Sequence, residues 1–242
     1  PLDVPARSYR GPEISPDGKR IAVAIYQERN LDVWIHDLDR GTWSRFTFGS
    51  TADFNPHWTP DGSRILYNHE EPQFSIFQRP TDGSADASLL LRLPVDANLS
   101  GISPDGELLV FSNSDTANKQ DLMVYPLDGS SDPRPVVRSP FNVSNGAVSP
   151  DGNWLDSQSN ESGSSQIYAV AFPQGGSRIQ ISIAGGLAPL WSPRGDEIFF
   201  MDEEGLMVAD VDLAGSTATE LDVGRPRRWT TGPFGDVNFD EE

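Results

Sequence analysis

Histidines and carboxylates are the side chains that would perform acid–base or metal chemistry in this chain if several of them converged. The chain has three histidines, His36, His57 and His69. His57 stands three residues before Pro60, and Glu13 stands three residues before Pro16, so they share one register of a repeated sequence. The other copies carry Gly101, Ala147 and Leu190 in that register. No ring of metal ligands is therefore predicted, and a lone histidine there favours a packing or hydrogen-bonding role.

Motifs for nucleophilic and phosphate chemistry are missing from the sequence. No Gly-x-Ser-x-Gly nucleophile elbow occurs. Neither of the two common glycine-rich phosphate-binding loops occurs either. We therefore expect no catalytic residue, no cofactor and no metal in this chain.

The element that positions these side chains is the tetrapeptide Ser15-Pro16-Asp17-Gly18. Later copies are Thr59-Pro60-Asp61-Gly62, Ser103-Pro104-Asp105-Gly106, Ser149-Pro150-Asp151-Gly152 and the altered Ser192-Pro193-Arg194-Gly195. The five prolines are separated by 44, 44, 46 and 43 residues. Proline fixes φ, aspartate bonds the nearby backbone and glycine accepts a positive φ, so each copy predicts a tight turn between two strands. A fixed period of this length is typical of a repeat architecture.

Each repeat contains four short strands by its apolar pattern and its turn residues. In the first repeat these are expected at about residues 10–14, 20–27, 32–37 and 43–48. Four strands in one repeat are the signature of a propeller blade. We predict an all-β propeller of five complete, four-stranded antiparallel blades at residues 10–48, 54–93, 98–138, 143–183 and 187–230. The whole chain, residues 1–242, is expected to be a single domain.

One register of the repeat is apolar in every copy. It lies two residues before the proline and holds Ile14, Trp58, Ile102, Val148 and Trp191. Such a register predicts side chains that pack between neighbouring blades rather than in a binding site.

Composition limits the partners and the environment. The net charge of −18 argues against nucleic acid and anionic membrane, since both require a basic surface. No apolar run is long enough to predict a membrane span, and no signal peptide is visible. Because the chain has no cysteine, no disulfide is expected, and both the periplasm and the cytoplasm remain open.

Longer motifs resemble the repeat of TolB-like β-propellers, which are WD-repeat-like. One such run is Phe54-Asn55-Pro56-His57-Trp58-Thr59-Pro60-Asp61-Gly62, followed by Arg64-Ile65-Leu66-Tyr67. Ser159-Asn160-Glu161-Ser162-Gly163 and Pro189-Leu190-Trp191-Ser192-Pro193 are more specifically similar to the propeller found C-terminal to bacterial serine/threonine kinase domains. The resemblance covers about residues 5–230 and implies a bacterial propeller that binds a partner.

Polar and aromatic residues gather, by register, where the innermost strands of a propeller begin. These are Tyr9, Arg10, Asp53, Phe54, Asn98, Asn142 and Asn145. A channel opening lined by both polar and aromatic residues can bind a peptide or a small ligand. The alternative is that these residues belong to ordinary solvated loops. We predict that Arg10, Asp53 and Asn98 bind the ligand, with His57 deeper in the channel.

The ends of the chain depart from the six-bladed ring that the resemblance implies. Pro1-Leu2-Asp3-Val4 and residues 234–240 offer at most one strand each. Residues 1–9 and 231–242 are therefore predicted to be stubs of a sixth blade that cannot pair with each other. The ring is expected to stay open at this position or to close as five blades with the stubs laid aside. We favour five ordered blades and an incomplete sixth position, where open sheet edges would favour self-association.

The sequence thus favours a non-catalytic interaction or sensing propeller whose partner is a protein, a peptide or a small ligand. The alternative is an enzyme, a hydrolase or a lyase, that acts on a small molecule in the channel.

Overall fold

The structure is a computed structural model that describes residues 8–27, 29–70, 74–93, 97–114, 120–217 and 219–231. The described residues contain strands and turns but no helix, so none of them forms a helix that could cross a membrane. Contacts between residues divide the chain into two compact units. The first comprises Pro1–Asn118 and Val124–Arg134, and the second comprises Lys119–Met123 and Pro135–Glu242.

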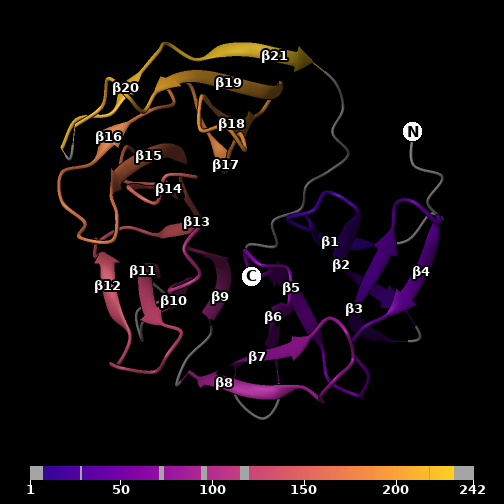
Figure 1. The fold of residues 1–242 in the computed structure, drawn as a ribbon. Coiled ribbons are helices and arrows are strands. Elements are labelled where there is room, and N and C mark those ends of the chain that lie inside the picture. Colours follow the sequence, from indigo (N-terminus) through magenta and orange to yellow (C-terminus); the bar gives the residue numbers. More distant parts are fainter. Residues whose placement is uncertain are drawn as a thin grey trace. The chain divides into compact units, whose positions relative to one another are not determined.

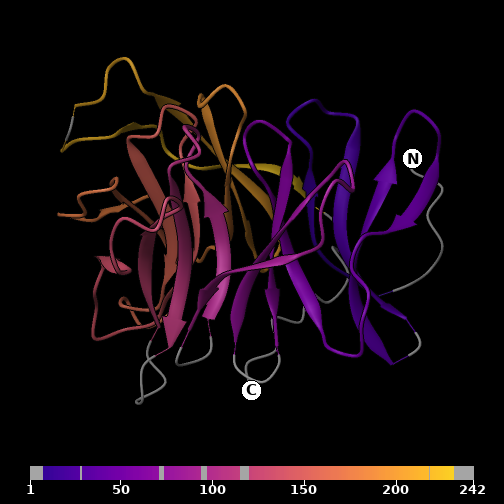
Figure 2. The same cartoon turned by 60° about the horizontal axis from the view of Figure 1, so that its bottom comes forward.

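Five sheets of antiparallel strands confirm the predicted fold class, a β-propeller of four-stranded blades (Figure 1). The first blade contains β1 (Tyr9–Ile14), β2 (Arg20–Gln27), β3 (Asn30–Asp37) and β4 (Thr42–Arg45). The second contains β5 (Asp53–Trp58), β6 (Arg64–His69), β7 (Ser75–Pro80) and β8 (Ser88–Arg92). In both, the strands lie side by side in sequence order, as the two views show (Figures 1 and 2).

The remaining sheets repeat this arrangement. The third contains β9 (Ala97–Ile102), β10 (Leu108–Ser114), β11 (Gln120–Pro126) and β12 (Arg134–Val137). The fourth contains β13 (Val143–Val148), β14 (Trp154–Ser159), β15 (Gln166–Ala171) and β16 (Ile179–Gln180). The fifth contains β17 (Leu187–Trp191), β18 (Glu197–Asp202), β19 (Gly205–Asp212), β20 (Asp222–Val223) and β21 (Arg227–Thr231). Both β20 and β21 pair with β19, so the outer edge of this blade is divided into two short strands.

The ends of the first and fifth blades each extend one residue beyond the predicted ranges. Tyr9 pairs with Ile25, and Thr231 pairs with Gly205, so both residues belong to sheets. Apart from Ser8, Tyr9 and Thr231, the proposed stubs of a sixth blade lie outside the described residues, as do Pro1–Val4 and residues 234–240. The incomplete sixth position and the single-domain organisation therefore stay predictions.

The repeated tetrapeptide forms the turn that its chemistry predicts. In the second blade, Gly62 N donates to Thr59 O at 2.8 Å, and the Thr59 hydroxyl donates to Asp61 Oδ1 at 2.6 Å. Ser63 N also donates to Asp61 Oδ1, at 3.0 Å. These hydrogen bonds, led by the one from Thr59, lower the pKa of Asp61 to about 2. Gly62 has a φ of 68°, which favours glycine at this position.

Every innermost strand is interrupted by a register shift against the second strand of its blade. Two of these shifts contain an asparagine with a positive φ, Asn55 at 49° and Asn145 at 53°. Both residues lie five positions before the proline of the following turn. Asparagine tolerates this left-handed conformation better than most residues, because its short side chain bonds locally.

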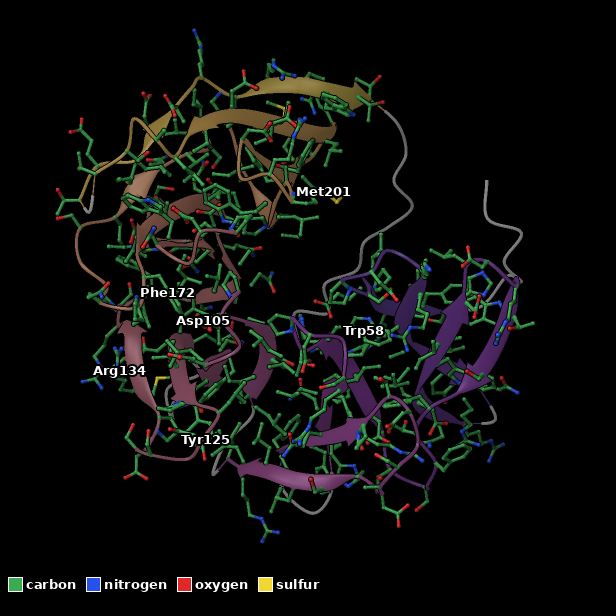
Figure 3. The ribbon with its side chains drawn as sticks, viewed as in Figure 1. Trp58, Asp105, Tyr125, Arg134, Phe172 and Met201 are labelled. Atoms are coloured by element: carbon green, nitrogen blue, oxygen red, sulfur yellow. The ribbon has the colours of Figure 1, made fainter. Side chains whose placement is uncertain are left out.

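The core lies between neighbouring blades within each unit. In the first unit, Trp58, which Figure 3 labels, lies in one cluster with Ala22, Val33 and Ile35 of the first blade. In the second unit, Trp191 packs with Trp154 of the fourth blade. The two tryptophans are 4% and 6% exposed, as expected for the apolar register.

Ile14 departs from that expectation because its side chain is 62% exposed. A residue of this register packs onto the preceding blade, as Trp58 packs onto the first. Ile14 belongs to the first blade, and the described residues of the first unit form no blade before it that could cover this side chain.

Candidate functional site

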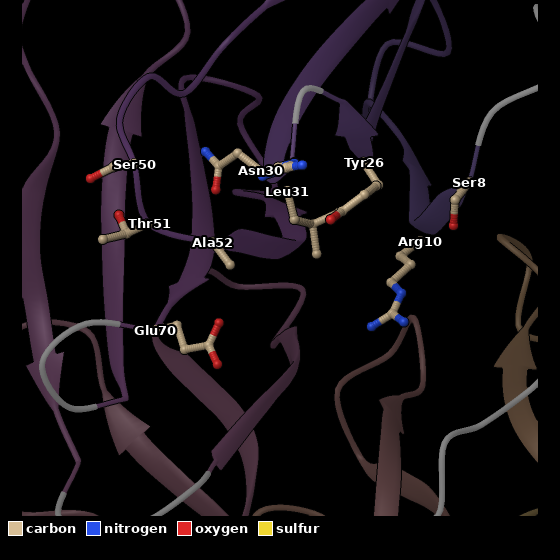
Figure 4. A pocket seen from close by; sticks show the side chains of 10 residues that line it. Ser8, Arg10, Tyr26, Asn30, Leu31, Ser50, Thr51, Ala52 and Glu70 are labelled. Atoms are coloured by element: carbon tan, nitrogen blue, oxygen red, sulfur yellow. The ribbon is translucent and has the colours of Figure 1, made fainter.

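A cavity of about 700 Å³ opens within the first unit, between segments of the first and second blades (Figure 4). We call it the Arg10 pocket. It is lined by Ser8, Arg10, Tyr26, Arg29, Asn30, Leu31, Ser50, Thr51, Ala52 and Glu70. Its volume falls in the usual range for sites that hold small molecules.

Strand ends place the side chains that line the Arg10 pocket. Arg10 lies at the start of β1, and Tyr26 lies near the end of β2, where its backbone N donates to Ser8 O at 3.3 Å. On the other side, Glu70 directly follows β6, and its backbone N donates to Ala52 O at 3.2 Å. Figure 4 shows Arg10 and Glu70 projecting toward the open middle of the pocket from opposite sides. The pocket therefore presents a cation and an anion to the same space.

Asn30 connects two of the segments that form the wall. Its side-chain Nδ2 donates to Gly49 O at 3.1 Å and to Asp32 Oδ1 at 3.2 Å. Asp32 is buried and receives a hydrogen bond from Arg45 Nη2 at 2.7 Å. A charge-assisted bond of this length to a buried carboxylate fixes the geometry strongly. The hairpin between β2 and β3 is thereby held against the loop after β4.

Arg29 occupies a strained position in that hairpin. Gln27 pairs with Asn30, so only two residues connect the strands, and Arg29 has a φ of 69°. Glycine or asparagine is the usual residue there, because a β-carbon crowds the backbone at positive φ. The hairpin thus places a second exposed guanidinium at the pocket where a glycine would be less strained.

Asp53 lies directly after the lining residue Ala52 but is itself only 4% exposed. Its Oδ1 lies 2.7 Å from His69 Nδ1. Burial raises the pKa of Asp53, although hydrogen bonds from His69 and Thr47 oppose that shift. The Asp53 carboxylate is therefore hydrogen-bonded to His69 behind the wall of the pocket and is not exposed to a ligand.

Thr51, His69 and Asp53 together have the residue types of a nucleophile, a base and an orienting acid. However, Thr51 Oγ1 lies 3.4 Å from His69 Nδ1 and 3.5 Å from Nε2, so it is not directed at the nitrogen that Asp53 leaves open. A productive pair requires a shorter bond to that one nitrogen. The His69 ring also rests against Phe77, with ring centroids 4.7 Å apart. This arrangement is a structural network rather than an activated hydroxyl.

His57 lies among the first three blades and does not line the Arg10 pocket. Its Nδ1 is 3.4 Å from Glu13 Oε1, and the ring is also hydrogen-bonded to the backbone of Leu99. Burial lowers the pKa of His57, but the Glu13 charge and the hydrogen bonds to Glu13 and Leu99 outweigh it, so the net shift is upward. Glu13 also accepts a hydrogen bond from Trp58 N, at 2.7 Å. The shared register of Glu13 and His57 therefore produces a contact between blades.

Asn98 is exposed and also lies outside the pocket lining. Its Oδ1 accepts a hydrogen bond from Asn55 Nδ2 at 3.4 Å. The structure thus brings only Arg10, of the four predicted binding residues, to the lining of the cavity, with Asp53 buried beside it. Asn142 and Asn145 belong to the second unit, where Asn145 donates to Gln158 Oε1 at 3.1 Å.

Residues that sequence reasoning missed include Tyr26, Arg29, Asn30 and Glu70. A signal existed for the hairpin, since the two residues between Gln27 and Asn30 are charged and include no glycine. Among the described residues, no group of three His, Asp or Glu side chains is placed to hold a metal ion.

Comparisons with known proteins agree with this fold. A TolB structure from Acinetobacter baumannii superposes with a TM-score of 0.71 at 18% identity, over 91% of this chain and 57% of that one. A protein assigned as TolB from Agrobacterium tumefaciens superposes with a TM-score of 0.72 at 21% identity, over 91% of this chain and 84% of that one. The fold is therefore that of a TolB-like β-propeller.

Comparison of sequences matches a smaller part of the chain than comparison of structures does. No family model matches the chain. The uncharacterized protein Atu1656 of Agrobacterium fabrum is 32% identical over 72 residues, which are 29% of this chain. The match covers a quarter of that relative's length. The specific similarity to kinase-associated propellers stays a prediction.

Proposed function

We propose that this chain is a non-catalytic binding propeller whose ligand occupies the Arg10 pocket. The observation that carries this proposal is a cavity of about 700 Å³ with exposed charged side chains at its mouth. Its walls are held by backbone pairing and by the hydrogen bond from Arg45 to the buried Asp32, so little ordering is required on binding. A preformed cavity with a few convergent polar groups is the usual form of a ligand site.

The partner that the fold suggests is a protein or peptide, of which a small part would enter the pocket. TolB-like neighbours support an interaction role at the level of fold analogy. Self-association through open edges at the ends of the chain belongs to the same proposal and concerns residues outside those described.

Binding can be tested by following the thermal midpoint of the purified chain against a library of metabolites and short peptides. Arg10→Gln removes one of the two positive charges at the pocket, and Arg40→Gln is the matched control because the Arg40 side chain is 80% exposed in the turn after β3. We expect at least one compound to raise the midpoint of the wild type and of the Arg40 variant but not of the Arg10 variant.

The alternative, an enzyme, predicts a different outcome of the same experiment. A compound converted to product by the wild type would contradict the non-catalytic role. Stabilisation that both arginine variants retain would place the ligand outside the Arg10 pocket.

A further inference from the structure

Charges of opposite sign meet across the Arg10 pocket. Arg10 and Arg29 lie in the first blade, and Glu70 lies in the second. The first blade supplies the positive wall from β1 and the β2–β3 hairpin, and the second blade supplies the negative wall. A ligand that satisfies both walls carries a negative group at one end and a positive group at the other.

The positive wall suits a carboxylate. A guanidinium presents a planar fork of donors that matches a carboxylate, and two forks can share its two oxygens. The chain as a whole carries a net charge of −18, so two exposed arginines beside one cavity contrast with the general surface. Arg29 occupies this position although glycine adopts its φ of 69° with less strain.

The remaining lining residues suit a small polar backbone rather than a large apolar group. Tyr26 and Leu31 provide the largest apolar surfaces of the lining, and Tyr26 is 57% exposed. Ser50, Thr51 and Asn30 add hydroxyl and amide groups. Such a lining can hydrogen-bond peptide N–H and C=O groups while the side chain of Leu31 contacts apolar atoms.

We propose that the Arg10 pocket binds a zwitterion, which is a free amino acid or a short peptide with unmodified termini. Its carboxylate contacts Arg10 and Arg29, and its ammonium group contacts Glu70. This inference rests on the proposed binding function and names the ligand class of the same site.

Calorimetry or thermal-midpoint measurements with three probe sets test this inference. The first set is the twenty free amino acids, the second is trialanine and triglycine, and the third is the same tripeptides with an acetylated N-terminus or an amidated C-terminus. We expect binding within the first or second set and a loss of roughly tenfold or more in affinity on capping either end. Stronger binding in the first set identifies a free amino acid, and stronger binding in the second identifies a peptide.

Variants of the chain complete the test. Arg29→Gly is expected to weaken binding of the carboxylate by roughly tenfold while leaving the thermal midpoint unchanged or higher, since glycine relieves the positive φ. Glu70→Gln should abolish the difference in affinity between probes with a free and with an acetylated N-terminus. Arg40→Gln, the control, should change neither the affinity for the free probes nor the effect of capping.

Three results would overturn the inference. They are equal affinity for capped and free probes, unchanged binding in the Arg29 and Glu70 variants, and no binding of any probe. In each case the proposed binding function survives if another compound of the library stabilises the wild type through Arg10. It fails separately if no compound does so or if a compound is turned over.

Discussion

Asn145 donates a hydrogen bond from Nδ2 to Gln158 Oε1 at 3.1 Å, and Asn55 makes the same contact, at 3.4 Å, with Asn68 Oδ1. In both units the donor has a positive φ and lies five residues before a turn proline. The accepting amide oxygen also accepts a hydrogen bond from the next blade. Asn68 Oδ1 accepts one from Leu99 N at 2.9 Å, and Gln158 Oε1 accepts one from Ala188 N at 3.3 Å. A side-chain amide of the second strand thus connects successive blades in each unit.

Asn68→Leu should destabilise the chain by about 1–3 kcal/mol, because it leaves two buried backbone groups without partners. These groups are Leu99 N and Ala97 O, which lies 2.9 Å from Asn68 Nδ2. Urea unfolding measures the free energy of unfolding. Hydrogen exchange of the Leu99 amide should also accelerate, because this N–H loses its acceptor. Asn153→Leu is the control, since Asn153 is exposed and its side chain donates to Asp151 Oδ2 within the same turn. A loss no larger than that of the control would contradict the role of Asn68.

Gly62→Val and Gly106→Val should each destabilise by about 1–3 kcal/mol, because valine strongly disfavours a positive φ. The φ values are 68° and 75°, while the nearest atoms to an added β-carbon are 3.8 and 3.7 Å away. The expected cost is therefore backbone strain rather than a clash. Gly101→Val is the matched control, since it lies in β9 with no atom near an added β-carbon and no positive φ. Thermal midpoints that match this control would refute the turn geometry.

Asp156→Asn should stabilise the chain at pH 7 by about 1 kcal/mol or more, because asparagine is neutral in both states, whereas the buried Asp156 must take up a proton on folding. Asp156 is fully buried, and neither of its oxygens has a hydrogen-bond partner. It pairs across the sheet with Ala147 and Ala169, and β17 of the next blade carries no ionisable residue. In the other blades its register holds Ala22, Leu66, Val110 and Phe199.

Burial raises the pKa of Asp156 well above its ordinary value of 3.8. The folded state therefore holds the proton at a pH where the unfolded state has lost it. The stability from this group is fully present below that ordinary pKa and falls as pH rises toward the folded pKa. Unfolding free energies measured from pH 4 to pH 8 should show this decline in the wild type and a flatter profile in Asp156→Asn. Parallel profiles would contradict it.

Glu13→Gln should lower the pKa of His57, because it removes the negative charge 3.4 Å from Nδ1. The raised pKa of His57 means that its stabilising contribution is present below about 6.5 and is lost as pH rises through the folded pKa. An NMR titration of the His57 ring measures the shift directly. A His57 titration that Glu13→Gln leaves in place would show that Glu13 does not set it.

The amino-acid sequence by itself determined the turns and the period of this protein. Proline, aspartate and glycine act within four residues, so Thr59-Pro60-Asp61-Gly62 could be interpreted without knowing what surrounds it. The apolar register that contains Trp58 and the shared register of Glu13 and His57 followed from the same period. These features depend on local chemistry and on repetition, both of which a sequence displays directly.

Tertiary structure decided which side chains reach the cavity. Arg10 and Asp53 both stand at the starts of inner strands, yet one is exposed at the Arg10 pocket and the other is buried against His69. The lining comes from both blades, and Arg29 and Glu70 are brought to it by a hairpin and by the end of β6. Register alone cannot show this, because burial and charge pairing depend on how one blade packs onto the next, over separations of about forty residues.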